Sequence, residues 1–183
     1  MNYIKIDLPL QDKVIVDLKV GDRVLLNGFV YTARDAAHKR MYDEYYLNNS
    51  FPFDLNGQTI YYVGPCPNKP NEIIGSAGPT TSGRMDKYTP LILNNGIKGM
   101  MGKGNRNQEV VESIKENKAI YFGVIGGIGA LLKECIKQVD VIAYEELGTE
   151  AIRRLLIKDF PCIVAIDSMG RNIYEIEYKK YRL

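Results

Sequence analysis

The stretch AIYFGVIGGIGALLKECIKQVDVIAY, residues 119–144, decides the fold class. It begins with an apolar run at 119–125, passes through a glycine-rich turn into a helical pattern at about 130–137, and returns to an apolar run at 139–144. Short apolar runs bounded by turns indicate strands, and the order strand, helix, strand is typical of α/β proteins. We therefore expect an α/β fold.

The segments on either side extend this pattern. After the stretch we expect a helix at 149–157 and strands at 162–166 and 172–178. Before it the sequence reads more like paired strands, and we expect strands at 22–31, 59–63 and 72–77, with helices at 33–45, from 81 or 82, and at 108–117. Thr32 is the expected N-cap of the helix at 33–45. The prediction is a mixed sheet arrangement with helices packed on one side, in a single domain over residues 1–183.

Composition narrows the class of protein. Of the 183 residues, 45% are hydrophobic, and 24 Lys and Arg against 22 Asp and Glu leave a net charge of +2. This even balance disfavours a general nucleic-acid or polybasic membrane partner. The longest apolar run, 119–132, is broken by glycines and too short to span a bilayer, and residues 1–10 hold no apolar signal core. We expect a cytoplasmic protein.

Cysteine and histidine usage predicts no metal site in this chain. Cys66, Cys135 and Cys162 are widely spaced and odd in number, so they match neither a disulfide framework nor a CxxC metal pattern. We expect them to be buried, reduced thiols. His38 is the only histidine, which excludes a multi-histidine site.

Three loops at predicted strand ends each present one cation. They carry Arg34 after the strand at 22–31, Arg84 at the end of the hydroxyl-rich turn at 80–84, and Lys103 between two glycines. Hydroxyls and free N–H groups at a helix start, with a forked guanidinium nearby, suit an anion. Helix caps and solvated side chains would explain the same residues. The residues alone predict a binder of a small polyanion such as a dicarboxylate, and they do not define a reaction.

Two further features leave alternatives open. The glycines of GGIGA at 126–130 partly match a dinucleotide-binding turn, but Leu132 stands where that template needs a small residue. Close packing of a strand on a helix explains these glycines better than a nucleotide does. His38 lies one turn after Arg34 and could be a ligand, a proton-transfer group or a structural histidine.

Four motifs in order resemble those of a known family. They are YTARDAAH at 31–38, GPTTSGRMD at 78–86, GKG at 102–104 and GGIGA at 126–130. The chain resembles the β subunit of the iron–sulfur-dependent class I fumarases and L-tartrate dehydratases, which is equivalent to the C-terminal domain of the single-chain enzymes. The resemblance covers nearly the whole chain, from residue 18 to about residue 167.

This resemblance implies a fold and an activity. The fold would be a swivelling β/β/α domain, and the reaction the reversible hydration of fumarate to L-malate, or loss of water from a related hydroxy diacid such as tartrate. A [4Fe-4S] cluster would be ligated by cysteines of an α subunit, in an α2β2 assembly, and none would be bound by this chain. The competing hypothesis is a carboxylate-binding or regulatory domain without activity.

The resemblance also implies roles for individual residues. Arg34, Arg84 and Lys103 would bind the substrate carboxylates, and Thr80 would be the hydroxyl nearest the carbon that loses its proton. A threonine is a poor base unless a neighbouring charge activates it, and Arg34 is the expected activator. Candidate supporting residues are His38, Thr81 and Asp35.

Overall fold

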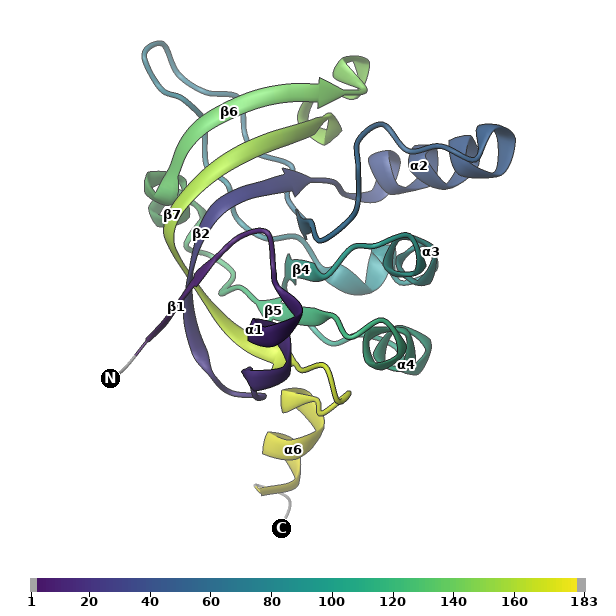
Figure 1. Ribbon diagram of the computed structural model, residues 1–183. Helices are drawn as coiled ribbons and strands as arrows, with labels where there is room; N and C mark the ends of the chain where they lie inside the picture. Colours follow the sequence, from purple (N-terminus) through teal and green to yellow (C-terminus); the bar gives the residue numbers. More distant parts are fainter. Residues whose placement is uncertain (1–2, 181–183) are drawn as a thin grey trace.

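Figure 1 shows the computed structural model, which describes residues 3–180 and, for side chains, residues 3–176. The strands are β1 (Ile4–Asp7), β2 (Arg23–Thr32), β3 (Thr59–Tyr61), β4 (Gly99–Gly102), β5 (Ile120–Gly123), β6 (Ile136–Ala143) and β7 (Ile152–Ile166). The α-helices are α1 (Asp12–Asp17), α2 (Asp35–Asn48), α3 (Thr89–Asn94), α4 (Gln108–Glu116), α5 (Gly129–Leu132) and α6 (Ile173–Lys180). Short 3₁₀ turns are η1 (Ser82–Met85), η2 (Lys133–Cys135) and η3 (Glu145–Glu150).

The sheet closes into a small barrel. Strands β2, β3, β4 and β5 are neighbours and run parallel. The long strand β7 runs antiparallel to both β5 and β2, so it joins the two ends of the parallel run. β1 adds to β2 as a parallel strand, and β6 adds to β7 as an antiparallel one. In Figure 1 the long, curved strands β2, β6 and β7 form the wall opposite helices α2, α3 and α4.

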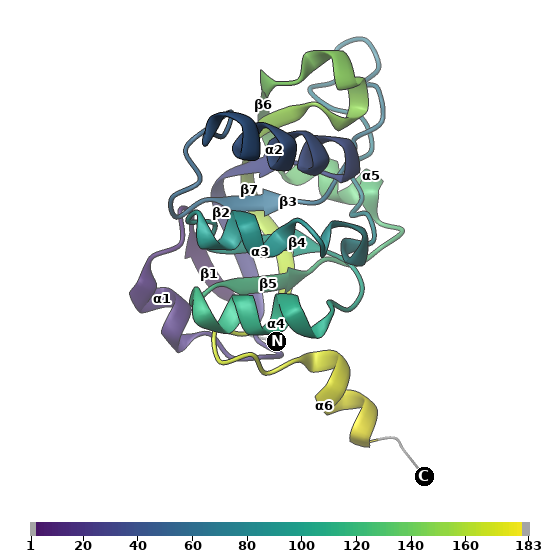
Figure 2. The same ribbon diagram turned by 90° about the vertical axis from the view of Figure 1, so that its right-hand side faces the viewer.

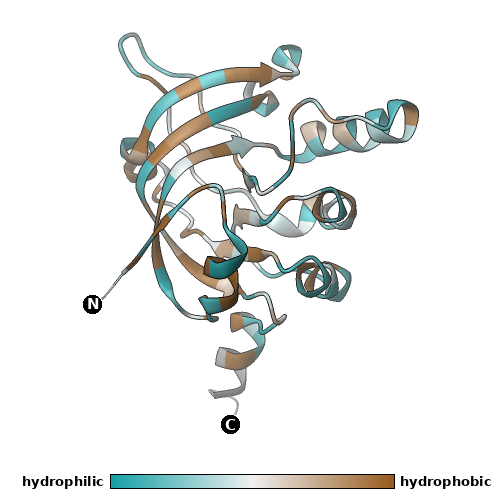
Figure 3. Cartoon of the chain, viewed as in Figure 1, coloured by the Kyte–Doolittle hydropathy of each residue, from teal (hydrophilic) through white to brown (hydrophobic). Residues whose placement is uncertain are grey.

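Two apolar layers flank the sheet. One fills the barrel and includes Phe122 and Phe160, and the other lies between the sheet and helices α2, α3 and α4. Neighbouring residues of β4 point to opposite layers, since Met101 belongs to the interior cluster and Met100 to the outer one. Figure 2 shows α2, α3 and α4 lying over β3, β4 and β5, and Figure 3 shows hydropathy alternating along β6 and β7. The expected mixed α/β fold is confirmed; swivelling stays a prediction.

The C-terminal third differs from the prediction at two places. The helix expected at 149–157 is mostly strand β7, because β2 and β6 bond to both of its edges there and this pairing overrides helix propensity. The strand expected at 172–178 is instead helix α6. This segment alternates in sequence, but it follows the end of β7 and joins the sheet only through a single bridge, at Asn172, so a helix satisfies its backbone hydrogen bonds locally.

Three other expectations were wrong. Residues 72–77 form no strand, and their backbone folds tightly onto the preceding loop, where a Cβ added to Gly75 would lie 2.4 Å from the carbonyl oxygen of Cys66. Thr32 ends β2 rather than capping α2; its hydroxyl donates to the carbonyl of Ala151 at 3.1 Å. Cys66 is exposed and Cys135 is half-buried, so of the three free thiols only Cys162 is buried.

The helix expected at about 130–137 is shorter: it consists of α5 and η2, and β6 already begins at Ile136. The helix expected from 81 or 82 starts as the 3₁₀ turn η1 and is followed by α3. The other predicted strands and helices occur close to their expected positions. Among residues 3–180, the structure contains no helix with the length and apolar character needed to cross a membrane.

Candidate functional site

The predicted cationic loops meet at one edge of the barrel. Because β2, β3, β4 and β5 are parallel, their carboxyl ends face the same way, and this is where α/β proteins bind ligands. The segment after β3 is held to the segment after β4 by two backbone bonds. The Ser82 N–H donates to the Lys103 carbonyl at 2.9 Å, and the Lys103 N–H donates to the Thr80 carbonyl at 3.3 Å.

Thr80 and Arg84 are in direct contact. The Nη2 of Arg84 donates to the Thr80 hydroxyl at 2.5 Å and lies 3.1 Å from Oδ2 of Asp35. The backbone N–H of Thr80 donates to the carbonyl of Tyr62 at 2.8 Å, which ties the residue to the end of β3. A cation beside a hydroxyl favours its ionised form. The arginine in contact with this hydroxyl is Arg84, whereas the expected activator was Arg34.

Arg34 lies at the start of α2 between two carboxylates. Its Nε donates to Oδ2 of Asp35 at 3.3 Å and lies 3.3 Å from Oε1 of Glu150. The other oxygen of Glu150 accepts the N–H of Ala36 at 2.7 Å. Asp35 thus bridges both arginines through one oxygen atom. The sequence did not point to Glu150, because no local motif marks it. It lies more than a hundred residues after Arg34, and only the folded chain brings η3 against the start of α2.

Lys103 extends from the glycine-flanked turn after β4. Its side chain is exposed and passes the loop after β5, where a Cβ added to Gly126 would lie 3.3 Å from its Cδ. Within the described part of the chain its ammonium makes no ion pair. Gly126 therefore leaves room for the side chain of Lys103, and the lysine charge is available to an anion. Lys103 and the two arginines supply three positive charges, and Asp35 and Glu150 supply two negative ones. The edge therefore keeps an excess of positive charge.

A buried ion pair beneath the site was also missed. The Nε of Arg106 donates to Asp86 at 2.6 Å, and its Nη2 donates to the hydroxyl of Thr89 at 2.7 Å. The guanidinium also lies against the rings of Tyr62 and Tyr121, 5.2 and 5.1 Å from their centroids. This pair connects the segment that carries Thr80 to the segment that carries Lys103. The polar run GKGNRN at 102–107 indicated a loop, but nothing in it indicated that Arg106 is buried.

The other two supporting candidates are placed differently. Thr81 is exposed and pairs with Lys103 through the backbone alone. His38 is buried, and its ring lies against Tyr62 and Tyr88. Its Nδ1 lies 3.0 Å from the carbonyl oxygen of Arg34, so Nδ1 carries the proton as the donor. Burial lowers the pKa of His38 to about 4. The histidine is therefore neutral at pH 7 and packs beneath Arg34.

The burial of His38 should make stability depend on pH. The unfolded chain takes up the proton near pH 6.5 and the folded chain only near pH 4, so stability falls as the pH drops through this window. Between pH 7 and pH 5 this costs the wild-type protein about 2 kcal/mol of unfolding free energy. His38→Gln should lack this component. Urea unfolding of both proteins at the two pH values tests it, and equal pH dependence would contradict the assignment.

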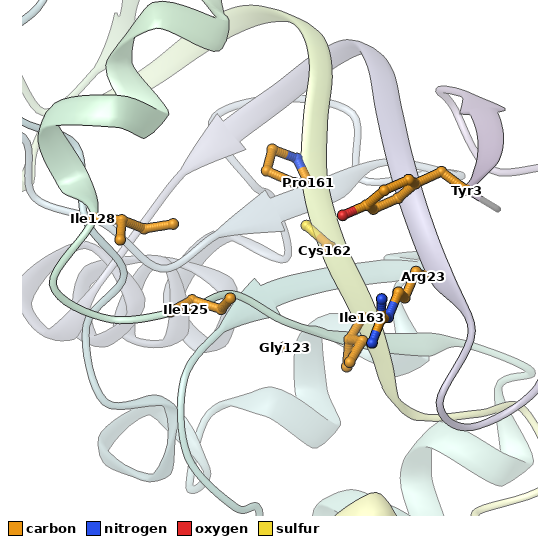
Figure 4. A pocket seen from close by; sticks show the side chains of 8 residues that line it. All are labelled: Tyr3, Arg23, Gly123, Ile125, Ile128, Pro161, Cys162 and Ile163. Carbon is orange, nitrogen blue, oxygen red and sulfur yellow. The ribbon is translucent and has the colours of Figure 1, made fainter. Parts of the chain in front are cut away.

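A cavity of about 300 Å³ lies elsewhere on the barrel, between β7 and the loop after β5 (Figure 4). Its lining is mostly apolar. The lining residues are Tyr3, Arg23, Gly123, Ile125, Ile128, Pro161, Cys162 and Ile163. Burial raises the pKa of the Cys162 thiol, so this thiol stays protonated at neutral pH. No residue predicted for the site lines this cavity, and its chemistry does not suit a small polyanion. We therefore place the candidate site at the strand ends.

The family model described as Fumarase C-terminus matches residues 1–177. The chain belongs to this family. It is 41% identical over 177 residues to the "Putative L(+)-tartrate dehydratase subunit beta" of Methanocaldococcus jannaschii, covering 93% of this chain and 91% of that protein. The family assignment confirms the resemblance that the motifs had indicated, and it makes the chain a member of a hydro-lyase family.

Longer relatives match over only part of their length. The chain is 39% identical over 177 residues to the "Putative fumarate hydratase class I" of Geobacillus stearothermophilus, which covers 94% of this chain and 34% of that protein. It is also 39% identical over 178 residues to "Fumarate hydratase 2" of Leishmania major, covering 93% of this chain and 31% of that protein. This fumarase C-terminus chain thus spans about a third of the length of these fumarate hydratases.

Proposed function

We propose that the chain is the β subunit of a two-subunit hydro-lyase that reversibly hydrates fumarate to L-malate, or dehydrates a related hydroxy diacid such as tartrate. The observation that supports the proposal is that Arg34, Arg84 and Lys103 follow three strand ends at one barrel edge. Arg84 contacts the Thr80 hydroxyl, Asp35 links Arg84 to Arg34, and backbone bonds join Lys103 to the Thr80 segment. A dicarboxylate needs cationic contacts for both of its ends. A hydro-lyase also needs a group that moves the proton next to a carboxylate.

Substrate binding in this proposal uses the three cations unequally. Arg34 and Arg84 are paired with Asp35 in the free chain, so a substrate carboxylate competes with an existing ion pair there. The ammonium of Lys103 has no such competitor within the described residues, and it serves as a compact charge for a carboxylate. We infer that Lys103 contributes chiefly to binding.

Proton transfer in this proposal falls to Thr80. In the dehydration direction Thr80 acts as an alkoxide, formed by loss of its hydroxyl proton to solvent, and the Arg84 guanidinium at 2.5 Å lowers the cost of that alkoxide. The alkoxide takes a proton from the substrate carbon that lies between a carboxylate and the hydroxyl-bearing carbon, which returns Thr80 to its hydroxyl form before the substrate hydroxyl leaves as water. Loss of that proton places a second negative charge on the carboxylate as an aci-carboxylate. The clustered cations stabilise this charge more than they stabilise the substrate, which is the condition for a faster reaction.

The cluster of such an enzyme would be supplied from outside this chain. Within residues 3–176, whose side chains are described, no group of three or more His, Cys, Asp or Glu side chains is placed to hold a metal ion, and the three cysteines are free. The residues present therefore do not fit a [4Fe-4S] cluster. We propose that cysteines of an α subunit ligate it, in an α2β2 assembly in the cytoplasm, and that this domain swivels against that partner.

The test is to co-express the chain with its α subunit, reconstitute the complex with iron and sulfide without oxygen, and assay fumarate, malate, tartrate and citramalate. We expect turnover of at least one diacid by the complex, and neither iron nor turnover in the isolated chain. Stoichiometric iron in the isolated chain would contradict the divided site. A complex that binds diacids but turns over none would support the competing regulatory domain.

A further inference from the structure

A clamp on Arg34 is built from residues that lie far apart in the sequence. Arg34 occupies the N-cap position of α2, but its side chain cannot accept a hydrogen bond, and no side-chain cap is present there. Glu150 of η3 takes over this role, because its Oε2 accepts the N–H of Ala36 at 2.7 Å. Its Oε1 lies 3.3 Å from the Nε of Arg34. One carboxylate thus caps the helix and pairs with the arginine.

The second part of the clamp is Gly64, just after β3. A Cβ added to Gly64 would lie 2.9 Å from both Cδ and Nη1 of Arg34, and 3.3 Å from the carbonyl oxygen of Thr149. The arginine side chain therefore lies directly against the Gly64 backbone, in a space that alanine would occupy. The φ angle of Gly64 is not in the positive range that favours glycine, so the backbone conformation does not itself require a glycine here. The close approach of Arg34 gives a reason for glycine here.

We infer that Glu150 and Gly64 are positioning residues that hold the Arg34 guanidinium in the direction needed to bind a substrate carboxylate. Without them the arginine would still be present, but its long side chain would adopt several rotamers. An ordered guanidinium loses less entropy on binding than a mobile one does. The inference deepens the proposed function and rests on it for the identity of the ligand, whereas the clamp itself is a property of the chain alone.

Two variants separate positioning from folding. Glu150→Gln keeps an oxygen that can accept the N–H of Ala36, so it retains the cap and removes the charge that faces Arg34. Gly64→Ala meets mainly the flexible end of Arg34, so the arginine moves before the backbone does. Glu145→Gln is the matched control, because Glu145 is an exposed residue of the same η3 turn.

The first measurement uses the isolated full chain and needs no activity. We follow the Nε–Hε signal of Arg34 by ¹⁵N NMR, assigned by its loss in Arg34→Lys. The signal should shift and exchange faster with solvent in Glu150→Gln and in Gly64→Ala, and it should be unchanged in Glu145→Gln. An Arg34 signal that is the same in all four proteins would overturn the clamp, whatever the enzyme does.

The second measurement uses the reconstituted complex with fumarate. Glu150→Gln and Gly64→Ala should each raise KM about tenfold, and in an Arg34→Ala background neither should raise it further, because residues that act through one another are not additive. Full additivity would overturn the positioning role, since it would mean that both residues act elsewhere. A complex inactive on every diacid, with the NMR result intact, would refute the proposed function and limit the inference to the clamp.

Discussion

Thr80→Ala should lower kcat for fumarate hydration about 10²- to 10⁴-fold, the range lost with a general base, while KM stays close to the wild-type value. The threonine side chain accepts a hydrogen bond from Arg84, which is its one polar contact among the described residues. Alanine removes the hydroxyl and leaves the three cations that would bind the carboxylates. The rate should therefore fall without loss of ground-state binding.

Conservative variants sharpen this expectation. Thr80→Val keeps the shape and branching of threonine but has no hydroxyl, so it should be as slow as Thr80→Ala. Thr80→Ser restores the hydroxyl and should recover part of the rate. Lys103→Ala is the contrasting case, because it should raise KM more than it lowers kcat. Steady-state kinetics on the reconstituted complex supply these values.

Isotope exchange tests the proton transfer more directly. In deuterated solvent the wild-type complex should exchange one methylene proton of malate, and Thr80→Ala and Thr80→Val should both lose this exchange. If Thr80→Val kept full exchange and full kcat, another residue, for example one of the α subunit, would have to remove the proton. The role of this chain would then be limited to binding the substrate.

Arg84→Lys should lower kcat/KM about thirtyfold to a thousandfold although it conserves the charge. The Arg84 guanidinium contacts the Thr80 hydroxyl and the Asp35 carboxylate together, at 2.5 and 3.1 Å. A lysine ammonium is a single point with a different reach, so it cannot keep both contacts and also offer a planar fork to a carboxylate. Loss of the contact with Thr80 should lower kcat, and loss of the fork should raise KM.

Arg171→Lys is a matched control for this substitution. Its Nε pairs with Asp167 at 2.7 Å, and its side chain is 49% exposed, against 47% for Arg84. It lies after β7, outside the cationic edge, so the complex should keep wild-type kinetics. Near wild-type kinetics in Arg84→Lys as well would show that Arg84 acts as a surface residue.

The strands and helices with a strong local pattern were predictable. The helix at 108–117 and the strand at 119–125 have clear periodicity and clear stop signals, and both occur in the structure. The segment at 149–157 failed because its state depends on two strands that lie far away in the chain. The segment at 172–178 failed because alternation indicates a strand only where a sheet edge can receive it.

The candidate site divides in the same way. Arg34, Thr80, Arg84 and Lys103 could be chosen from the sequence, since each lies in a loop after a predicted strand and carries a group that suits an anion. Their contacts could not be predicted. The arginine that contacts Thr80 is Arg84, because η1 turns its guanidinium back onto the hydroxyl.

The sequence by itself determined the class of fold, the family and the residue types at the cationic edge, because these follow from local periodicity and contiguous motifs. Only the tertiary structure decided that the sheet closes through β7, that Glu150 and Gly64 both contact Arg34, and that the Arg106–Asp86 pair joins two loops. These contacts join residues that are often many positions apart. Their energies depend on burial and distance in the folded chain, which no local sequence window contains.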